Sequence, residues 1–397
     1  MAEQPNALWI VAAKRTPFGA FNGAFKALTA TDLAVHASQA AIAQSGVAPQ
    51  DFDHVFAGNV AQSSTDAAYL ARHVGLRAGL PERTPALTLN RLCGSGFQVL
   101  LNAAQLIRLG EAKAVLAVGT ENMTQAPHVL RGLRDGLKFA KAPALEDSLW
   151  SALTDSYAGC PMGITAEKLG AKYGITRSEA DAFALRSQQR WAKAQQAGDF
   201  ADELATVEVP ARRGSVPVSV DESPRPDSTA EGLAKLKAVF QQDGLVTAGN
   251  ASGIADGAAA LVVVDAAWGK AQGLQPLAAL TDWAVVGVDP TIMGIGPAPA
   301  IRRVLEKAKA QIGDIDLFDV NEAFAAQFLA VQRELELPEE RTNIHGGAIA
   351  LGHPLAASGA RIAMNLIYAL RRLDKAQAVG AACIGGGQGI AVRLEAR

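Results

Sequence analysis

Short apolar runs alternate with longer helical patterns along most of this chain. Helical patterns begin at Ser95 and at Ser358, and another covers residues 180–196 behind Thr176 and Glu179, which have the spacing of a capping box. The apolar runs have the length and composition of buried strands and lie at residues 114–118, 258–265, 317–320, 378–382 and 390–394. This alternation predicts an α/β protein.

An internal repeat relates the two ends of the chain. Asp51-Phe-Asp53 matches Asp314-Ile-Asp316 at an offset of 263 residues. The same offset relates Ser95-Gly96 to Ser358-Gly359, Asn102 to Asn365, and Arg108 to Arg371. One offset shared by separated identities is harder to obtain by chance than a single match, so we predict two related α/β halves.

The segment between the two repeats differs from them in composition. Residues 124–249 are rich in charge and helix signals and have few strand-like runs, and the prolines within 215–229 predict an extended loop there. We therefore expect an N-terminal half (1–123 plus 250–274), an inserted loop domain (124–249) and a C-terminal half (275–397).

The composition of the chain limits the classes of partner that it is expected to bind. The 397 residues are 49% hydrophobic and carry a net charge of -2, which argues against nucleic acid or an anionic membrane as the main partner and favours a small molecule. The apolar run at residues 8–13 is too short for a signal peptide or a membrane span, so we expect a cytoplasmic enzyme.

Only three cysteines occur, at positions 93, 160 and 383. Their odd number and wide spacing predict neither a disulfide framework nor a zinc site, and no metal is expected. Each is either a buried core residue or a reactive thiol.

Cys93 lies between a strand-like stretch and the helix that starts at Ser95. Free N–H groups and the helix dipole favour a thiolate there, although a buried, inert cysteine is the alternative. His353 holds the corresponding position in the second copy, just ahead of Ser358-Gly359, so the repeat would bring an imidazole base close to the thiol.

Two further motifs place polar chemistry at strand ends. Cys383 leads into a glycine-rich turn that is not a dinucleotide fingerprint, because a strand and not a helix follows it. Such a turn either exposes N–H groups as an oxyanion hole beside a second thiol or forms a tight hairpin around a core cysteine. Asn321 follows the 317–320 run and could hold a water, while Glu322 could cap the next helix.

Taken together, these motifs resemble the thiolase family over nearly the whole chain. The matching segments are Ala13-Lys-Arg-Thr-Pro-Phe-Gly19, Asn90-Arg-Leu-Cys-Gly-Ser-Gly96, Val246-Thr-Ala-Gly-Asn-Ala-Ser-Gly253, Asn321-Glu-Ala-Phe324, Gly346-Gly-Ala-Ile-Ala-Leu-Gly-His-Pro354 and Cys383-Ile-Gly-Gly-Gly387. The resemblance implies a five-layer fold of two α/β halves with an inserted loop domain, and a reversible CoA-dependent Claisen condensation or thiolysis.

The resemblance also implies a role for each catalytic residue. Cys93 would attack an acyl-CoA after His353 takes its proton, and Cys383 would exchange a proton with the α-carbon of acetyl-CoA. The N–H groups of Cys93 and Gly385 would hold the thioester oxygen, while His353 and a water on Asn321 would hold the enolate oxygen. No cofactor is implied, because CoA is itself a substrate or product.

The family pattern further implies the contacts with acetyl-CoA, acyl-CoA or 3-ketoacyl-CoA. The residues that match the CoA-binding positions are Met162, Arg225, Ser228, Phe240, Ser252 and Phe324. Residues 132–141 would supply an arm for a homotetramer, with a homodimer as the other possibility.

This chain departs from the family pattern at two positions beside the catalytic histidine, His345 and Ala356. Cys160-Pro-Met-Gly163 replaces the His-Met-Gly of short-chain biosynthetic relatives, which favours the broader 3-ketoacyl-CoA thiolases.

Three other readings compete with the thiolase interpretation. A decarboxylating ketoacyl synthase normally has His or Asn where Cys383 stands, and a non-catalytic acyl-CoA-binding protein need not keep all four reactive residues. A serine hydrolase is disfavoured because Gly94-Ser-Gly96 lacks the spacing of a nucleophile elbow.

Overall fold

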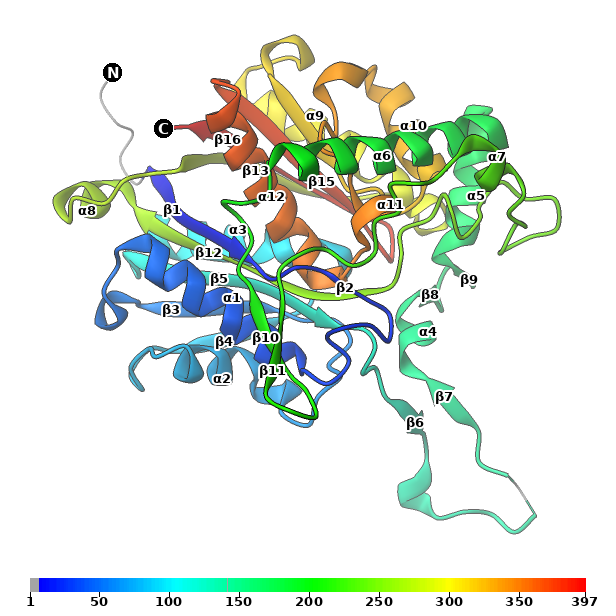
Figure 1. Cartoon of the computed structure of the whole chain (residues 1–397), viewed down its shortest axis with the longest axis horizontal. Coiled ribbons are helices and arrows are strands. Elements are labelled where there is room, and N and C mark those ends of the chain that lie inside the picture. Colours follow the sequence, from blue (N-terminus) through cyan, green and yellow to red (C-terminus); the bar gives the residue numbers. More distant parts are fainter. Residues whose placement is uncertain (1–6, 141) are drawn as a thin grey trace.

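A single mixed sheet of ten strands runs through the molecule (Figure 1). The computed structural model describes residues 7–140 and 142–397. The sheet has the order β14-β15-β16-β13-β1-β12-β5-β3-β4, and β2 pairs with β12. Its strands are β1 (Leu8–Arg15), β2 (Gly19–Ala20), β3 (His54–Gly58), β4 (Ala86–Leu89), β5 (Ala114–Asn122), β12 (Ala255–Asp265), β13 (Ala278–Gly287), β14 (Leu317–Val320), β15 (Gln377–Ile384) and β16 (Gln388–Ala396). The predicted α/β class is confirmed.

The sheet order repeats about its centre, where β1 pairs with β13. Moving outward, β1-β12-β5-β3 on one side corresponds to β13-β16-β15-β14 on the other. Asp53 accepts hydrogen bonds from the N–H groups of Lys113 and Ala114 at 2.6 and 3.2 Å. Asp316, 263 residues later, accepts the corresponding pair from residues 376 and 377, both at 3.0 Å. The repeat seen in the sequence is therefore also a repeat of hydrogen bonds.

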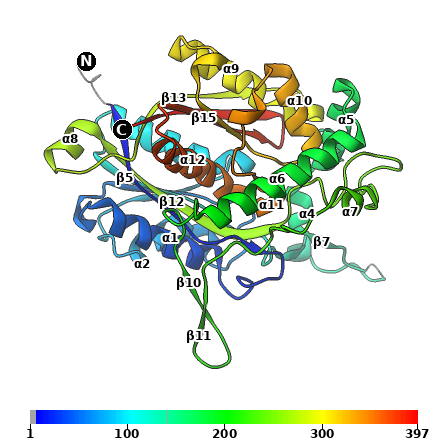
Figure 2. The ribbon, with the colours of Figure 1, turned by 45° about the horizontal axis from the view of Figure 1, so that its top comes forward.

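Helices form three layers around the two halves of the sheet (Figures 1 and 2). The central layer contains α3 (Ser95–Arg108) and α12 (Leu355–Arg372), which contact each other and strands of both halves. The outer layers contain α1 (Ala30–Ser45) and α2 (Leu70–Arg77) on the N-terminal half, and α9 (Pro297–Ala308) and α10 (Ala325–Leu335) on the C-terminal half. Two short helices complete the halves, α8 (Ala266–Ala271) and α11 (Ala348–Leu351).

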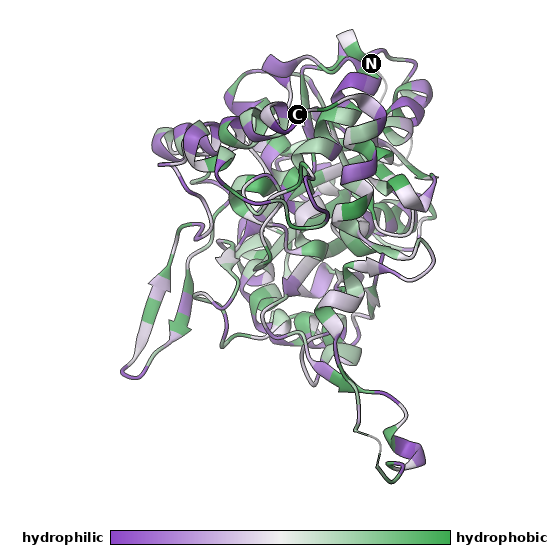
Figure 3. Ribbon diagram, turned by 90° about the vertical axis from the view of Figure 1, so that its right-hand side faces the viewer, coloured by the Kyte–Doolittle hydropathy of each residue, from purple (hydrophilic) through white to green (hydrophobic). Residues whose placement is uncertain are grey.

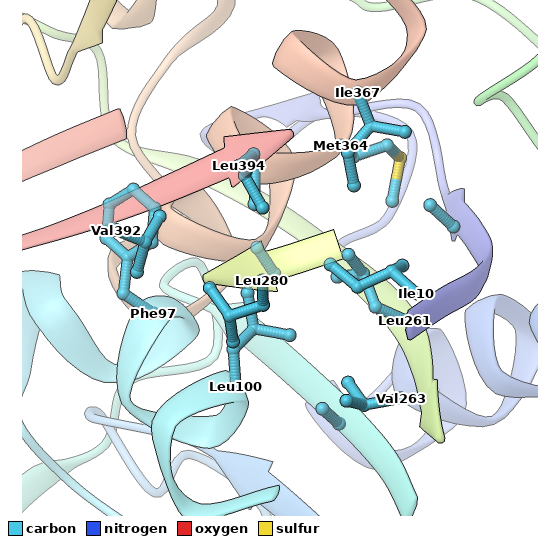
Figure 4. Packing of buried hydrophobic residues seen from close by; sticks show 14 of the residues in the cluster. Ile10, Phe97, Leu100, Leu261, Val263, Leu280, Met364, Ile367, Val392 and Leu394 are labelled. Carbon is cyan, nitrogen blue, oxygen red and sulfur yellow. The ribbon is translucent and has the colours of Figure 1, made fainter. Parts of the chain in front are cut away.

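The central core joins both halves. Phe97 and Leu100 of α3 pack with Met364 and Ile367 of α12 and with inward-facing strand residues such as Leu394 (Figure 4). All residues of α12 from 355 to 370 are buried, as expected for a helix enclosed on every side. Burial of each large side chain here contributes about 1.5–3 kcal/mol to the free energy of unfolding. This packing fixes the positions of α3 and α12 and of the residues at their ends.

The two halves differ in one connection. Three residues join β15 to β16, whereas the corresponding step from β5 to β12 holds the inserted segment, residues 123–254. Its helices are α4 (Ser148–Ala152), α5 (Met162–Tyr173), α6 (Arg177–Ala197) and α7 (Ala230–Ala234). Its strands form three small hairpins, β6 (His128–Leu130) with β7 (Leu145–Asp147), β8 (Thr154–Asp155) with β9 (Cys160–Pro161), and β10 (Val207–Pro210) with β11 (Ser215–Val218). The capping box predicted for Thr176 and Glu179 begins α6.

Two of these hairpins stand away from the body (Figures 1 and 3). The longer one, with β6 and β7 at its base, is called the arm below; Lys141, which we assigned to it, lies outside the described residues. The other hairpin, β10 with β11, corrects a prediction. We expected an extended loop over residues 215–229, but residues 215–218 form strand β11. Pro217 is tolerated there because the ribbon has only two strands, so each is an edge.

None of the helices within 7–140 and 142–397 is both long and apolar enough to cross a membrane.

Candidate active site

Cys93 lies in a 3₁₀ turn, Leu92–Gly94, that joins β4 to α3. Leu92 has a positive φ of 46°, a conformation that bulky residues rarely adopt and that is typical of functional turns. The partly exposed cysteine packs against an apolar cluster that includes Leu355 and Ala356 at the start of α12. Two N–H groups, of Gly385 and of Cys93 itself, point at its sulfur.

The protonation state of Cys93 differs from the one we predicted. Burial, with a smaller contribution from the charge of Glu121, outweighs the two N–H groups and raises the pKa of the Cys93 thiol to about 11. The helix start therefore does not make a thiolate, because loss of water outweighs the dipole. A neutral thiol needs a base before it can attack.

His353 occupies the loop between α11 and α12, and the loop fixes its tautomer. The amide Nδ2 of Asn321 lies 3.3 Å from Nε2, and since an amide nitrogen can only donate, Nε2 accepts. The ring proton then sits on Nδ1, which donates to Ser358 Oγ at 2.6 Å, and that hydroxyl donates to the Pro354 carbonyl at 3.2 Å. Burial, assisted by Arg361, lowers the pKa of His353 to about 4. The imidazole is thus a neutral base at neutral pH.

Asn321 comes directly after β14 and is fully buried. Its Oδ1 has no hydrogen-bond partner among the described residues, so it can accept from a water or substrate. Glu322, in contrast, does not cap α10. It accepts hydrogen bonds from Ser187 Oγ, Asn343 Nδ2 and the Ile349 N–H at 2.7, 3.0 and 3.2 Å.

Cys383 lies near the end of β15 and is fully buried, beside Met293 and Ala323. Burial raises its pKa well above the ordinary range, and the neighbouring Cys93 raises it further. Gly385 follows in the turn to β16, and Gly386 and Gly387 both have φ near 80°, which favours glycine. The structure thus brings a second neutral thiol and the glycine turn to Cys93.

A cavity of about 500 Å³ opens beside the loop that carries His353 and is lined in part by Ile349 and Gly352. Arg225 and Ser228 line it, together with Gly253, whose carbonyl accepts the His353 N–H at 2.8 Å. Among the described residues the Arg225 guanidinium has no hydrogen bond or ion pair, so it is available for an anion.

The other four predicted CoA residues lie nearer the thiols. Ser252 Oγ donates to the Ala323 carbonyl at 3.0 Å, and the rings of Phe240 and Phe324 meet edge to face at 6.2 Å. Met162 packs with Phe324 against the cluster that contains Cys383. No group of three or more His, Cys, Asp or Glu side chains suited to a metal occurs within the described part of the chain.

Two family models divide the chain between them. The model for the thiolase N-terminal domain matches residues 8–267, and the model for the thiolase C-terminal domain matches residues 274–396. This chain belongs to the thiolase family. The prediction of a thiolase-type acyltransferase is confirmed.

Individual thiolases resemble it over their whole length. The chain is 54% identical to a protein named 3-ketoacyl-CoA thiolase, mitochondrial, from Homo sapiens, over 98% of both chains. It is 45% identical to an acetyl-CoA acetyltransferase from Chromobacterium violaceum, covering 97% of this chain and 98% of the other. A crystal structure of human mitochondrial 3-ketoacyl-CoA thiolase in complex with CoA superposes with a TM-score of 0.97 at 53% identity, covering 99% and 98% of the two chains.

These comparisons contradict the expected cytoplasmic location, because relatives from Homo sapiens and Mus musculus are named as mitochondrial. The prediction rested on the lack of a long apolar run near residue 8. Segments that direct proteins into mitochondria are in general amphipathic and rich in arginine, so an apolar run is the wrong criterion.

Sequence reasoning missed two residues of this thiolase site. Ser358 served only as a marker of the repeat, yet it bonds to His353. Glu121 was not singled out, although it follows the 114–118 run much as Asn321 follows the 317–320 run. For Glu121 the available signal was a charged residue close to the end of a buried apolar run, whereas Ser358 lies inside α12 and had no such signal.

Proposed function

We propose that this thiolase exchanges acyl groups between CoA thioesters, cleaving 3-ketoacyl-CoA with CoA and, in reverse, joining two acetyl-CoA molecules. The observation that carries the proposal is that two neutral thiols, Cys93 and Cys383, lie close enough to interact, and that Cys93 packs against Leu355 and Ala356, directly after the neutral imidazole of His353. One thiol with one base would suit acyl transfer alone. The names of the human and bacterial relatives support both directions of the reaction.

In the first half of the proposed reaction, Cys93 becomes acylated. His353 Nε2 takes the thiol proton, the Cys93 sulfur attacks the thioester carbonyl, and the bond from that carbon to the CoA sulfur breaks. The departing CoA takes the proton back from His353 and leaves as a thiol. The N–H groups of Cys93 and Gly385, which point at the sulfur in the free enzyme, are placed to bind the oxygen as negative charge develops on it.

In the second half, Cys383 handles the proton of the α-carbon. During thiolysis the Cys383 thiol gives its proton to the departing acetyl carbanion, and the resulting thiolate takes a proton from the CoA thiol that then attacks the acyl group on Cys93. Synthesis is the reverse: the departing CoA takes the Cys383 proton, the Cys383 thiolate removes the α-proton of acetyl-CoA, and the carbanion attacks the acyl group on Cys93. We assign the enolate oxygen to a water held by the free Oδ1 of Asn321 and to His353 once its Nε2 carries a proton.

For CoA binding, we assign the cavity lined by Arg225 and Ser228 to the nucleotide end. Phe240, Phe324, Ser252 and Met162 then contact the pantetheine on its way to Cys383. On this proposal residues 124–249 act as a CoA-binding and oligomer-forming domain, and the halves 1–123 plus 250–274 and 275–397 supply the nucleophile and the acid/base residues.

Oligomer formation is the next expectation. The arm exposes Leu133, Leu137 and Phe139, and β4 is an edge strand with Leu87 exposed, so we propose a homotetramer or homodimer. Sedimentation equilibrium should show an oligomer for the intact protein. Phe139→Asp should shift it to a smaller species without changing its circular dichroism, and a monomeric intact protein would contradict the proposal.

Incubation with acetyl-CoA tests the proposed function directly. We expect release of free CoA and an acetyl group on the peptide that contains Cys93, because the acyl-enzyme should form without a second substrate. Intact-protein and peptide mass spectrometry measure both. A competent preparation that released no CoA and carried no acetyl group there would disprove the proposal.

A further inference from the structure

Two buried carboxylates anchor the loop that carries His353. At its start, Glu322 Oε2 accepts the Ile349 N–H at 3.2 Å; at its end, Glu121 Oε2 accepts the Ala356 N–H at 3.1 Å. Between them, the His353 N–H donates to the Gly253 carbonyl at 2.8 Å. Glu322 belongs to the C-terminal half and Glu121, at the end of β5, to the N-terminal half.

Glu121 also holds the loop that follows β3. Its Oε1 accepts hydrogen bonds from Asn59 Nδ2 and the Ala61 N–H, both at 2.9 Å, and its Oε2 accepts the Val60 N–H at 3.1 Å. Val60 and Ala356 belong to the apolar cluster against which Cys93 packs. The Glu121 carboxylate therefore links the apolar cluster around Cys93 to the end of the His353 loop.

All four partners of Glu121 are donors, so only the ionised carboxylate satisfies them with both oxygens. The ionisable groups that act on it are Asp256 of β12 and Cys93 of the 3₁₀ turn. The loop after β3, and α12, offer it only amide and backbone N–H groups. Burial, with a contribution from Asp256, raises the pKa of Glu121 to about 7.

We propose that Glu121 is a positioning residue for acylation: it sets His353 relative to Cys93 through the Ala356 N–H. Its charge also adds to the effect of burial in keeping the Cys93 thiol protonated until His353 takes the proton. Glu121 itself reaches no reacting atom, since its hydrogen bonds among the described residues are all to N–H groups. This inference rests on the proposed roles of Cys93 and His353.

The position of Glu121 gives the pH dependence a definite sign. Above about pH 7 the Glu121 carboxylate is charged and accepts all four hydrogen bonds. Below about pH 7 protonation removes one acceptor, which weakens the hydrogen bond from the Ala356 N–H that holds the His353 loop, called the tether below. Acylation should therefore slow as the pH falls through about 7. His353 cannot cause this, because its pKa is about 4.

Three variants separate the tether from the charge. Glu121→Gln removes the charge and one of the two acceptor oxygens, and Glu121→Asp keeps the charge but shortens the reach to Ala356. Glu322→Gln is the matched control at the other end of the loop. The measurements are single-turnover CoA release from acetyl-CoA and the pH midpoint of Cys93 alkylation by iodoacetamide. Glu121→Gln should lower kcat/KM for acylation on the order of 10- to 100-fold, the size expected from a misplaced base. It should also abolish the acidic limb near pH 7 and move the alkylation midpoint to lower pH.

The other two variants should show one effect without the other. Glu121→Asp should slow acylation while keeping the wild-type alkylation midpoint, and Glu322→Gln should likewise keep that midpoint, since Glu322 is not among the charges that act on Cys93. Glu121→Gln with wild-type acylation and midpoint would overturn the inference, as would an equal shift of the midpoint in Glu322→Gln.

If Glu121→Gln does not fold, Glu121→Asp tests the inference in its place. A wild-type rate of acylation in Glu121→Asp would show that the hydrogen bond to Ala356 does not position His353. The proposed function fails separately, if the wild-type enzyme in the same series takes up no acetyl group on Cys93.

Discussion

Replacing Cys383 with alanine should leave an enzyme that still acquires an acetyl group on Cys93 but no longer makes or breaks the carbon–carbon bond. Cys383 is fully buried near the end of β15, and no other thiol within the described residues belongs to its apolar cluster. Without it the α-carbon proton has no acceptor, and general acid–base catalysis of this kind is worth about 10²- to 10⁴-fold. Acylation, which we assign to Cys93 and His353, should change little.

Two assays on the same preparation measure this separation, one for CoA release with acetyl-CoA alone and one for thiolysis of acetoacetyl-CoA. Cys160→Ala is the matched control, because Cys160 is also buried but lies outside the cluster of Cys383. Full thiolysis by Cys383→Ala would remove this residue from the mechanism, and equal losses in both variants would point to general damage.

Replacing His353 with alanine should slow acylation itself. The Cys93 thiol has a pKa of about 11, so at pH 8 only about one molecule in a thousand carries a thiolate without help from a base. We therefore expect CoA release to fall on the order of 10³-fold at pH 8. The loss should shrink about tenfold for each pH unit towards 10, because hydroxide then does what the imidazole did.

His345→Asn provides the control for this variant. His345 is a second buried histidine, and it contacts Asn365 and Asp199 at 2.9 and 3.5 Å rather than the thiols. It should acylate at the wild-type rate. If His353→Ala lost activity equally at every pH from 7 to 10, the histidine would not be acting as the base for Cys93.

Much of the fold could be predicted because local and repeated signals agreed. The 263-residue offset anticipated the paired strands and the two central helices, and Asp53 and Asp316 make corresponding hydrogen bonds to backbone N–H groups. The prediction for residues 215–229 was wrong at its start because a two-stranded ribbon accepts a proline that a larger sheet would exclude.

The site could be predicted in its residues but not in its electrostatics. Sequence spacing placed Cys93 at a helix start, yet the pKa of its thiol depends on burial by residues of the other half, such as Leu355 and Ala356. Ser358 and Glu121 were missed for a related reason. Their roles arise from contacts with the His353 loop, and spacing along the chain does not report such contacts.

The central place of β1 has a consequence for synthesis on the ribosome. β1 pairs with β12 from Leu8↔Asp265 onward and with β13 at Trp9↔Ala279, so its partners emerge about 250 residues after it does. At roughly 5–20 residues per second, this apolar strand waits about 13–50 s for them. The nascent chain must therefore keep its first strand from pairing wrongly for longer than most helices take to form, which makes early chaperone contact with residues 8–15 valuable.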